Sequence, residues 1–285
     1  MSVNDSEYWP FGNMTLGDVA YHSLRFSLLA IYLLFIIGVF LQIISVSFRA
    51  PAEFFTQDPH WIPKEPTLTA WDDAFTRLAQ PLQNSAIIAT ITGVLTLLIA
   101  IPGAYAFART DLPRRELLFY FVIIALLFPY ILLIIPVSDL WWQLGLFDTK
   151  LGVSLAQLTI SVPFAIWVLR DFFQKLPPNL EEAAQVFGCS KFTAFARVAL
   201  PLATPAIIAV GFLAFLTGWN DFLFASMLTQ SANTTPAVVV LYQVTAGGEA
   251  TYWAWMMAMT LAIGIPPVIM YMVARSFLSE ALSFG

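Results

Sequence analysis

A polar stretch at 178–201, between two strongly apolar ones, holds the residues whose spacing points most clearly to chemistry. It reads PNLEEAAQVFGCSKFTAFARVALP. Asn179 can cap a helix, and Glu182, three residues later, can reach back to the cap amide in a capping box. Gly188 permits the left-handed conformation that ends a helix, and Pro201 is expected to stop a second one. The pattern predicts a helix–turn–helix that presents polar residues to water.

Each of the two predicted helices carries one apolar stripe at the spacing i, i+3, i+4 and i+7. The stripes are Leu180, Ala183, Ala184 and Phe187 on the first helix, and Phe192, Phe195, Ala196 and Ala199 on the second. An alternative is a juxtamembrane hairpin that lies on lipid. A helix at the lipid surface would usually carry more Lys and Arg than the Lys191 and Arg197 of this stretch, so docking on a protein is the favoured interpretation.

Several kinds of catalytic and cofactor site are missing from the sequence. No G-x4-GK[ST] phosphate-binding loop occurs, so this chain is not expected to bind ATP in the usual cradle. His22 and His60 are the only histidines and Cys189 is the only cysteine, which excludes an intrachain disulfide and gives no cluster for a metal. With so few histidines, no Ser/His/Asp or Cys/His set is plausible. The chain is therefore predicted not to be an enzyme.

The composition indicates what kind of scaffold positions these residues. Of the 285 residues, 59% are hydrophobic and only 11% are charged. A soluble domain carries about 25% charged residues. The chain is therefore predicted to be an integral membrane protein. Its net charge of −5 argues against nucleic acid as a partner.

The hydrophobic pattern predicts an all-α membrane protein, one domain over 1–285, with six transmembrane helices. The residues before the first apolar stretch lack the positive start and short apolar core of a cleaved signal, so that stretch is expected to remain as a helix. A short surface helix is expected around 71–78, and a kink at Pro102. The six spans are predicted at about 26–48, 84–107, 117–140, 151–169, 203–228 and 253–273.

Lys and Arg decide the orientation of these spans, because cytoplasmic loops carry an excess of them. With the amino terminus inside, nine of the thirteen cationic residues fall on the inner side and four on the outer side. The inner set is Arg25, Arg109, Arg114, Arg115, Arg170, Lys175, Lys191, Arg197 and Arg275, and the outer set is Arg49, Lys64, Arg77 and Lys150. Both termini are therefore expected in the cytoplasm, with the helix–turn–helix between spans four and five.

The spacing of the helix–turn–helix resembles a known signature. Glu-Ala-Ala at 182–184, then Gly188, then Leu-Pro at 200–201 match the EAA-x3-G-x11-LP pattern of permease subunits from binding-protein-dependent ABC importers. One departure is Phe187, where the family usually has Asp, and it favours a hydrophobic contact there. Four further stretches, NSAIIATITG, AYAFAR, LGLFDT and WNDFLFA, are similar to the carbohydrate-uptake branch, and to the smaller permease of the maltose-permease type.

The resemblance implies a larger assembly. In this family two different permeases pair, two ATPase subunits bind below them, and a sugar-binding protein docks outside. ATP and Mg belong to the ATPase subunits, so no cofactor is expected in this chain. ATP closes the ATPase dimer and draws the hairpins together, which opens the helix bundle outward in an alternating-access cycle. The residues implied in ATPase coupling are Glu182, Ala183, Ala184, Phe187, Gly188, Leu200 and Pro201.

Candidate residues for the sugar pathway are polar groups at membrane depth, where charges are costly and usually functional. The first candidate is Asp221 in the run Trp219-Asn220-Asp221, followed by Asp139 beside two tryptophans. Carboxylates and amides bind sugar hydroxyls, and aromatic faces stack on the sugar ring. Two alternatives stay open. Asp139 lies at the outer water interface, or Asp221 pairs only with the other permease, which in this family can hold most of the sugar.

The segment Thr229–Thr251 is expected to be a long outer loop that contains Gly247 and Gly248. The corresponding loop of the family can reach into the docked binding protein and displace sugar. In that case the two glycines lie at the contact with the binding protein. An ordinary solvent loop is the alternative.

The sequence thus predicts a permease subunit in the cell membrane that forms half of a sugar pathway and is energised through its hairpin. Within the same class, the alternative is another small polar solute such as a polyol or glycerol phosphate. A solute with a phosphate would require basic side chains in the pathway, and the outer half of the predicted membrane protein has few of them. A stand-alone secondary transporter would need ion-coupling residues and usually internal repeats, and neither is evident. A structural or assembly protein of the membrane would not need a cytoplasmic docking hairpin.

Overall fold

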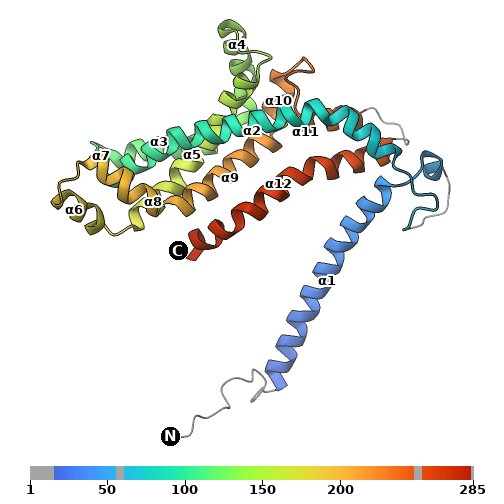
Figure 1. Cartoon of the computed structure of the whole chain (residues 1–285), viewed down its shortest axis with the longest axis horizontal. Coiled ribbons are helices and arrows are strands. Elements are labelled where there is room, and N and C mark those ends of the chain that lie inside the picture. Colours follow the sequence, from blue (N-terminus) through green and yellow to red (C-terminus); the bar gives the residue numbers. More distant parts are fainter. Residues whose placement is uncertain (1–15, 56–60, 247–251, 284–285) are drawn as a thin grey trace.

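The fold is described from a computed structural model, which describes residues 16–55, 61–246 and 252–283. Every regular element in these ranges is a helix (Figure 1). In the same ranges four helices are long and apolar enough to cross a membrane, and two bent pairs of helices would raise that number to six. The elements are α1 (Leu16–Ser47), η2 (Pro51–Phe55), α2 (Thr69–Arg109), α3 (Arg115–Leu127), η3 (Tyr130–Leu133), α4 (Ile134–Leu144), α5 (Lys150–Lys175), α6 (Asn179–Val186), α7 (Lys191–Ala194), η4 (Phe195–Ala199), α8 (Leu200–Leu202), α9 (Thr204–Asn220), α10 (Leu223–Leu228), α11 (Ala237–Ala246) and α12 (Tyr252–Ser283).

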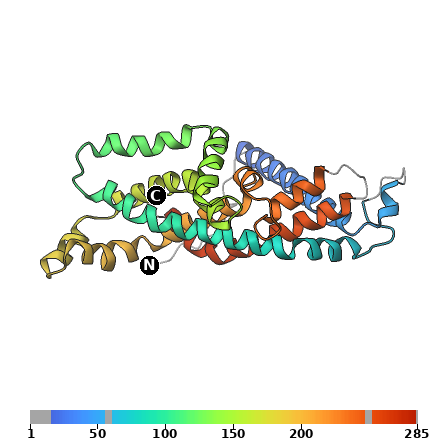
Figure 2. The same ribbon diagram turned by 90° about the horizontal axis from the view of Figure 1, so that it is seen from above.

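Helix α2 forms the axis of the molecule (Figure 1, Figure 2). Its 41 residues give a length of about 60 Å, which is about twice the thickness of a hydrocarbon core. The helix predicted at 71–78 is present, but it is the first part of α2 and not a short surface helix of its own. Ala70, Ala74 and Leu78 are buried among residues of α11 and α12, and this packing extends the helix beyond the predicted span of 84–107.

Helices α5, α9 and α12 pack on α2 (Figure 1, Figure 2). Small residues let the backbones approach closely, as in many pairs of membrane helices. A Cβ atom built at Gly218 of α9 would lie 2.7 Å from the Ala89 Cα atom of α2. A Cβ atom built at Gly93 of α2 would lie 3.6 Å from the Gly211 carbonyl oxygen. The interface between α2 and α9 is therefore a close contact between backbones.

Hydrogen bonds between buried side chains join α2 to α5 at two levels, one helical turn apart. The Thr92 hydroxyl donates to Gln157 Oε1 at 2.7 Å. The hydroxyl oxygens of Thr96 and Ser161 are also 2.7 Å apart. A hydrogen bond between membrane helices contributes about 0.6–2 kcal/mol. Because a register shift would break both bonds, they hold the two helices in one alignment.

The third predicted span, 117–140, is not one continuous helix. α3 ends at Leu127, η3 follows, and the arm that ends with α4 turns away from α3 by 90°. Pro129 explains the break, because a proline pushes the preceding residue into the extended region, and Phe128 has φ −74° and ψ 128°. α4 consequently stands out from the bundle, across the direction of α2 (Figure 1).

The fifth predicted span, 203–228, is also divided. α9 ends at Asn220, Asp221 is extended with φ −66° and ψ 119°, and α10 follows. Asp221 Oδ2 accepts the Ala225 N–H at 3.2 Å, so this side chain supports the first turn of α10. At its other end α9 meets the arm that ends at Leu202 at an angle of 74°. The apolar run predicts a crossing of the membrane but not these two bends.

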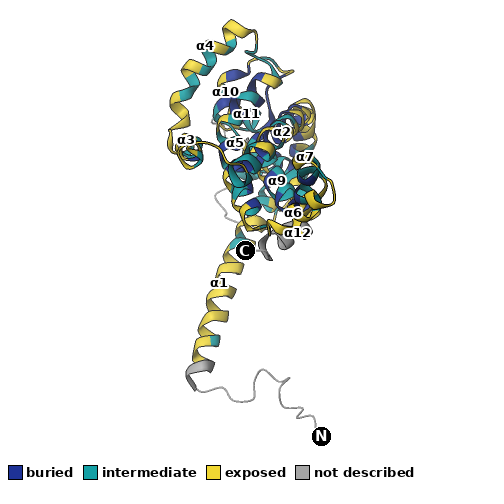
Figure 3. Ribbon diagram, turned by 90° about the vertical axis from the view of Figure 1, so that its left-hand side faces the viewer, coloured by how far each residue is buried: buried dark blue, intermediate teal, exposed yellow. Residues whose placement is uncertain are grey.

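Helix α1 leaves the bundle and is exposed around its circumference (Figure 3). None of its most apolar window is buried, although the helix contacts α12. Three consecutive residues, Leu33, Leu34 and Phe35, are all exposed. Consecutive positions point to different sides of a helix, so no single face packs on the core. An apolar circumference of this kind suits lipid or another membrane protein on every side.

Candidate functional site

The helix–turn–helix lies at one end of the molecule, beside the end of α2 (Figure 1). Its first arm is α6, and its second arm runs through α7, η4 and α8. Together the two arms and their turn occupy the stretch at 178–201 that the sequence predicts. We refer to this element as the hairpin.

The prediction of a capping box at the start of α6 is wrong. Asn179 is the first helical residue, and the cap position belongs to Pro178, whose ring offers no acceptor. The N–H groups of Glu181 and Glu182 both donate to the Pro178 carbonyl at 3.1 Å. Glu182 is exposed, and no residue in the described ranges engages its carboxylate. That carboxylate is therefore available to a partner.

The turn of the hairpin depends on Gly188, whose φ is 92° as the sequence predicts. The Gly188 N–H donates to the Gln185 carbonyl (2.9 Å), and the Cys189 N–H donates to the Ala184 carbonyl (3.0 Å). This pair of bonds is a Schellman motif, which satisfies the last carbonyls of a helix. No atom lies within 4 Å of a Cβ built at Gly188, so glycine is needed for conformation and not for space.

The second arm begins at Ser190, whose Oγ accepts the Thr193 N–H at 3.1 Å and caps the helix. η4 is a π-helical turn in which the Leu200 N–H donates to the Phe195 carbonyl. Pro201 explains this turn, because its ring has no N–H for the carbonyl four residues earlier. The sequence predicts that Pro201 ends the second arm. In the structure Pro201 lies inside the last turn instead, because α8 continues one residue further.

Apolar side chains are exposed at the tip of the hairpin. Val186, Phe187 and Phe192 are 85%, 89% and 77% exposed, on either side of the Gly188 turn. Grouped exposed apolar residues mark a surface that binds another molecule. We refer to these three residues and Glu182 as the docking tip.

The other predicted coupling residues lie behind the docking tip. Ala183 is exposed and Ala184 is half-buried, and their carbonyls accept the N–H groups that close the turn. Leu200 is half-buried and Pro201 is exposed at the end of the second arm. The backbone of these residues shapes the hairpin, whereas the side chains of the docking tip are exposed.

Beneath the hairpin, Glu181 joins α6 to the bundle. Glu181 is only 8% exposed, and its Oε2 accepts a hydrogen bond from the Tyr105 hydroxyl of α2. The Arg109 Nε atom is 3.3 Å from Glu181 Oε1, and Arg109 Nη2 donates to the Leu176 carbonyl at the end of α5. We refer to Tyr105, Arg109 and Glu181 as the buried triad. A cavity of about 610 Å³ between α2 and the hairpin touches both the triad and Glu182.

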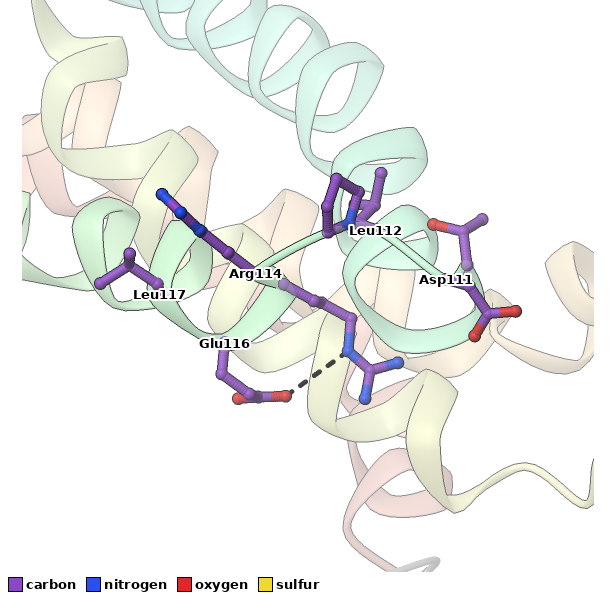
Figure 4. A pocket seen from close by; sticks show the side chains of 8 residues that line it. Asp111, Leu112, Arg114, Glu116 and Leu117 are labelled. Carbon is purple, nitrogen blue, oxygen red and sulfur yellow. Dashed lines mark ion pairs between the residues drawn. The ribbon is translucent and has the colours of Figure 1, made fainter.

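Figure 4 shows a second cavity, of about 500 Å³, at the connection between α2 and α3. Arg115 Nε lies 3.5 Å from the Glu116 carboxylate, and Arg170 of α5 reaches the same carboxylate at 2.6 and 2.8 Å. The Arg170 guanidinium also lies 3.8 Å from the centre of the Phe119 ring. These contacts join α3 to α5 at the end of the molecule that carries the hairpin.

The predicted pathway residue Asp221 is part of a hydrogen-bonded chain inside the bundle. Its Oδ2 accepts a hydrogen bond from Gln157 Nε2 at 3.2 Å, and Gln157 in turn accepts from Thr92. Gln157 is 1% exposed. The chain therefore connects α2 and α5 to the break between α9 and α10. Gln157 and Thr92 cannot be recognised from the sequence, because isolated polar residues in apolar helices have no characteristic spacing.

The structure separates the other predicted pathway residues. Trp219 is buried, its Nε1–H donates to the Ile263 carbonyl (3.2 Å), and its ring stacks on Phe215, so it acts in packing. Asn220 is exposed. Asp139 is exposed on α4, and neither a hydrogen bond nor an ion pair joins it to Asp221 among the described residues. Of these residues only Asp221 belongs to the buried chain.

A third cavity, of about 440 Å³, lies between α3, α5 and α9. Its lining is apolar except for the hydroxyls of Ser161 and Thr217. Ser161 is hydrogen-bonded to Thr96, and the Thr217 hydroxyl donates to the Leu213 carbonyl at 3.0 Å. Sequence reasoning missed both residues, since Ser and Thr are common in membrane helices.

Asp148 organises the end of α5 that is remote from the hairpin. It has a φ of 53°, and its Oδ1 accepts the N–H groups of Gln230 (2.8 Å) and Ser231 (3.1 Å) and the Thr234 hydroxyl. Partial burial alone would raise the pKa of Asp148, but these hydrogen bonds stabilise the carboxylate and lower the pKa to about 2. Asp148 therefore joins the α4–α5 connection to the segment after α10.

The prediction that Thr229–Thr251 is one long loop is wrong, because α11 lies within this segment. Side chains of α2 hold this segment: Asn84 donates to the carbonyls of Ala232 and Thr235, and Ser85 accepts the Ala237 N–H. These contacts are distant in sequence, which explains why the local pattern does not predict them. The predicted contact residues Gly247 and Gly248 lie outside the described residues.

Residues 97–280 match a family described as "Binding-protein-dependent transport system inner membrane component". The chain is similar to the sulfoquinovosyl glycerol transport system permease protein SmoH of Agrobacterium fabrum, with 32% identity over 88% of each chain. It is also similar to the trehalose transport system permease protein SugB of Mycobacterium tuberculosis, with 32% identity over 72% of this chain and 75% of that one. The inner membrane ABC transporter permease protein YcjP of Escherichia coli is 29% identical over 90% and 93%.

The fold is similar to a chain in the crystal structure of a bacterial ABC transporter involved in the import of the acidic polysaccharide alginate. The TM-score is 0.78, the identity is 23%, and the match covers 94% of this chain and 99% of that one. A chain of the same type of transporter, in complex with an alginate pentasaccharide-bound periplasmic protein, has a TM-score of 0.66 at 14% identity. At these identities the similarity is one of fold.

Proposed function

Because the chain belongs to the binding-protein-dependent transport system inner membrane components, we propose that it forms half of the pathway for a sugar and is driven through the hairpin by a separate ATPase. The family consists of permease subunits of ABC importers, so the chain is a membrane transport subunit and not an enzyme. ATP and Mg bind the ATPase subunits in this proposal. The chain itself supplies a docking surface and half of a passage.

The docking tip is the observation that carries the proposal. Exposed Phe187 and Phe192 offer apolar area, and the unengaged Glu182 carboxylate offers one charged acceptor beside them. A protein partner can cover the rings and donate a cationic group to the carboxylate, which gives both affinity and orientation. The hairpin contributes Glu182, Ala183, Ala184, Phe187, Gly188, Leu200 and Pro201 to this role, as the signature implies.

A sugar as the transported solute is supported by the relatives and by the chemistry of the bundle. Two relatives are named for transport of sulfoquinovosyl glycerol and trehalose. In this chain the Ser161 and Thr217 hydroxyls line the third cavity, and the Asp221 carboxylate lies beside the Gln157 amide at the α9–α10 break. Hydroxyl, amide and carboxylate groups can all form hydrogen bonds with the hydroxyls of a sugar. We propose Asp221 as the pathway residue of this chain, and assign no contact to Trp219.

Three kinds of partner complete the proposed importer. A second, different permease supplies the other half of the pathway, and two ATPase subunits bind the two hairpins. A sugar-binding protein delivers solute from outside, a partner of the kind named for the alginate transporter structure. The apolar circumference of α1 supports a second membrane subunit, since it is not covered by the described part of this chain.

We place the hairpin and both termini in the cytoplasm. The excess of Lys and Arg on that side supports the orientation. The end of α12 also points toward the hairpin end of the molecule (Figure 1). In this orientation the docking tip faces the compartment that contains ATP.

Reconstitution in lipid vesicles tests the proposed function. The chain is combined with the second permease, the ATPase subunits and the binding protein, and uptake of labelled trehalose and of glycerol phosphate is measured with ATP hydrolysis. We expect ATP-dependent uptake of a sugar only. ATP-dependent uptake of glycerol phosphate without sugar would contradict the substrate class, and uptake without ATPase subunits would contradict the importer.

The docking tip is tested by Phe187→Ser with Ile62→Ser as the control, since Ile62 is also highly exposed (79%, against 89% for Phe187) but lies in the connection between α1 and α2. Burial of a Phe side chain contributes about 1.5–3 kcal/mol, so ATPase affinity should fall about tenfold or more for Phe187→Ser. The control should keep its affinity. Equal ATPase affinity in both variants would refute the docking surface.

A further inference from the structure

We propose that Glu181 transmits movement of the hairpin to α2 through the buried triad, whereas its neighbour Glu182 serves docking alone. The inference rests on the proposed function and deepens it. It assigns a positioning role to a residue outside the EAA signature. The two glutamates therefore divide two tasks that the signature assigns to one element.

The two carboxylates point in different directions. Adjacent residues of an α-helix are separated by about 100° around its axis. Glu181 is buried against α2, and Glu182 is exposed. A partner that pulls on the outer carboxylate thus pulls an element whose inner carboxylate is fixed to the bundle.

The triad joins three helices at one point. Tyr105 and Arg109 lie one turn apart at the end of α2, and both contact Glu181 of α6. Arg109 Nη2 also donates to the Leu176 carbonyl, where α5 ends. A guanidinium beside two helix carboxyl ends is favourably placed in the dipole fields of both. The end of α2 therefore cannot move independently of α6.

The second arm of the hairpin reaches the same tyrosine. The centre of the Tyr105 ring lies 4.3 Å from the centre of the Phe195 ring of η4 and 5.6 Å from the centre of the Phe173 ring of α5. Both arms thus contact one residue of α2, the first arm through a carboxylate and the second through an aromatic ring. A movement of the hairpin as a unit is directed to that residue.

One contact of the triad is incompletely formed. Arg109 Nε and Glu181 Oε1 are 3.3 Å apart, yet neither atom makes a hydrogen bond of normal geometry in the described part of the chain. A small rotation of α6 or of the Arg109 side chain would align them. Interfaces that have two discrete arrangements are what couples distant sites. In our proposal the triad is such an element, and alignment of the Arg109–Glu181 pair would give its second arrangement.

From the triad, α2 leads to the polar chain in the membrane. Thr96 and Thr92 lie farther along the same continuous helix, and Thr92 connects through Gln157 to Asp221. A shift of the end of α2 is thereby passed to the break between α9 and α10. This route joins the docking tip to the proposed pathway residue without a contact between them.

Matched variants of the assembled importer test the inference. Glu181→Gln and Glu182→Gln make the same change at neighbouring positions, and Tyr105→Phe removes the hydroxyl donor. The measurements are co-purification of the ATPase and the number of solute molecules taken up per ATP hydrolysed. For Glu181→Gln and Tyr105→Phe we expect normal co-purification and a coupling ratio clearly below that of the wild type. For Glu182→Gln we expect weaker co-purification.

A charge exchange distinguishes positioning from general stability. Arg109→Glu combined with Glu181→Arg keeps the pair with its signs reversed, and it should recover part of the coupling ratio that each single variant loses. Thermal unfolding of each variant is the control for folding. Recovery of coupling without a change in unfolding temperature supports the inference. Loss of coupling that follows unfolding temperature alone, without recovery, would overturn it.

The test separates this inference from the function on which it rests. Wild-type protein that binds no ATPase would overturn the proposed function and the inference with it. A coupled wild type together with a fully coupled Glu181→Gln variant would overturn the inference alone. Normal co-purification of Glu182→Gln together with an uncoupled Glu181→Gln variant would remove Glu182 from docking and overturn the division of tasks between the two glutamates.

Discussion

Replacing Gly218 with alanine is expected to force α2 and α9 apart. A Cβ at this position would lie 2.7 Å from the Ala89 Cα atom and 3.1 Å from the Thr92 Cβ atom. Carbon atoms in contact are normally about 3.5–4.0 Å apart, so α9 must move by about 0.8 Å or more. Overpacking of this kind costs about 1–3 kcal/mol. The added methyl group would also lie 3.2 Å from Thr92 Oγ1, the atom that donates to Gln157, and crowding of this hydroxyl adds to the cost.

Gly264→Ala of α12 is the matched control, because no atom lies within 4 Å of its built Cβ. Both substitutions gain the same helix propensity, about 1 kcal/mol, so the difference between the variants isolates the steric cost. At about 2–4 °C per kcal/mol, Gly218→Ala should unfold about 2–12 °C below Gly264→Ala. The assay is thermal unfolding of the purified protein in detergent, followed by tryptophan fluorescence. Equal unfolding temperatures would refute the close backbone contact between α2 and α9.

Three further predictions concern the ends of the bundle. Lowering the pH from about 4 to 2 should remove the stabilisation by the Asp148 carboxylate. The unfolded chain protonates this carboxylate near pH 4, whereas the folded protein protonates it only near its lowered pKa of about 2. Unfolding of Asp148→Asn should lack that pH dependence. Gly188→Val should reduce binding-protein-stimulated ATP hydrolysis more than Gly188→Ala, since a branched side chain is least tolerated at a φ of 92°, and equal activities would contradict this. In a Cys189→Ala background, an impermeant thiol reagent added to intact cells should label Ala246→Cys and not Val186→Cys, and the reverse pattern would overturn the orientation.

The hairpin is predictable from the sequence because its signals are local. Gly188 ends the first arm by its own conformational freedom, and two apolar stripes mark the faces of the arms. The capping box fails for an equally local reason, since Pro178 takes the cap position and leaves Asn179 inside the helix. Local patterns thus predict the element and miss one residue of its register.

The buried triad could not be predicted, because its contacts join residues far apart in the chain. Tyr105 and Glu181 are separated by 76 positions, and the signature begins at Glu182, so no sequence signal indicates that the adjacent Glu181 is the buried carboxylate. The same holds for the hydrogen bond between Thr92 and Gln157. Only the packing of α2 against its neighbours decides which polar groups are buried together.

Hydrophobicity predicts that a stretch lies in the membrane but not that it is one straight helix. The third span contains Pro129, and a proline in a membrane helix is compatible with a kink, a break or no bend, depending on its neighbours. In the fifth span the break at Asp221 is stabilised by the side chain itself, which supports the next helix. Both bends depend on tertiary partners that apolar composition does not specify.

The apolar circumference of α1 has a consequence for how the protein is made. A helix whose backbone groups are satisfied internally, and whose surface is apolar on every side, is stable in lipid by itself. α1 can therefore insert during synthesis before the helices that follow it, and tether the nascent chain while α2, α5 and α9 assemble. In the proposed importer this surface would stay uncovered until the second permease binds, and an unassembled subunit would be open to membrane quality-control proteases. The cellular abundance of this subunit is accordingly expected to follow that of the subunit that covers α1.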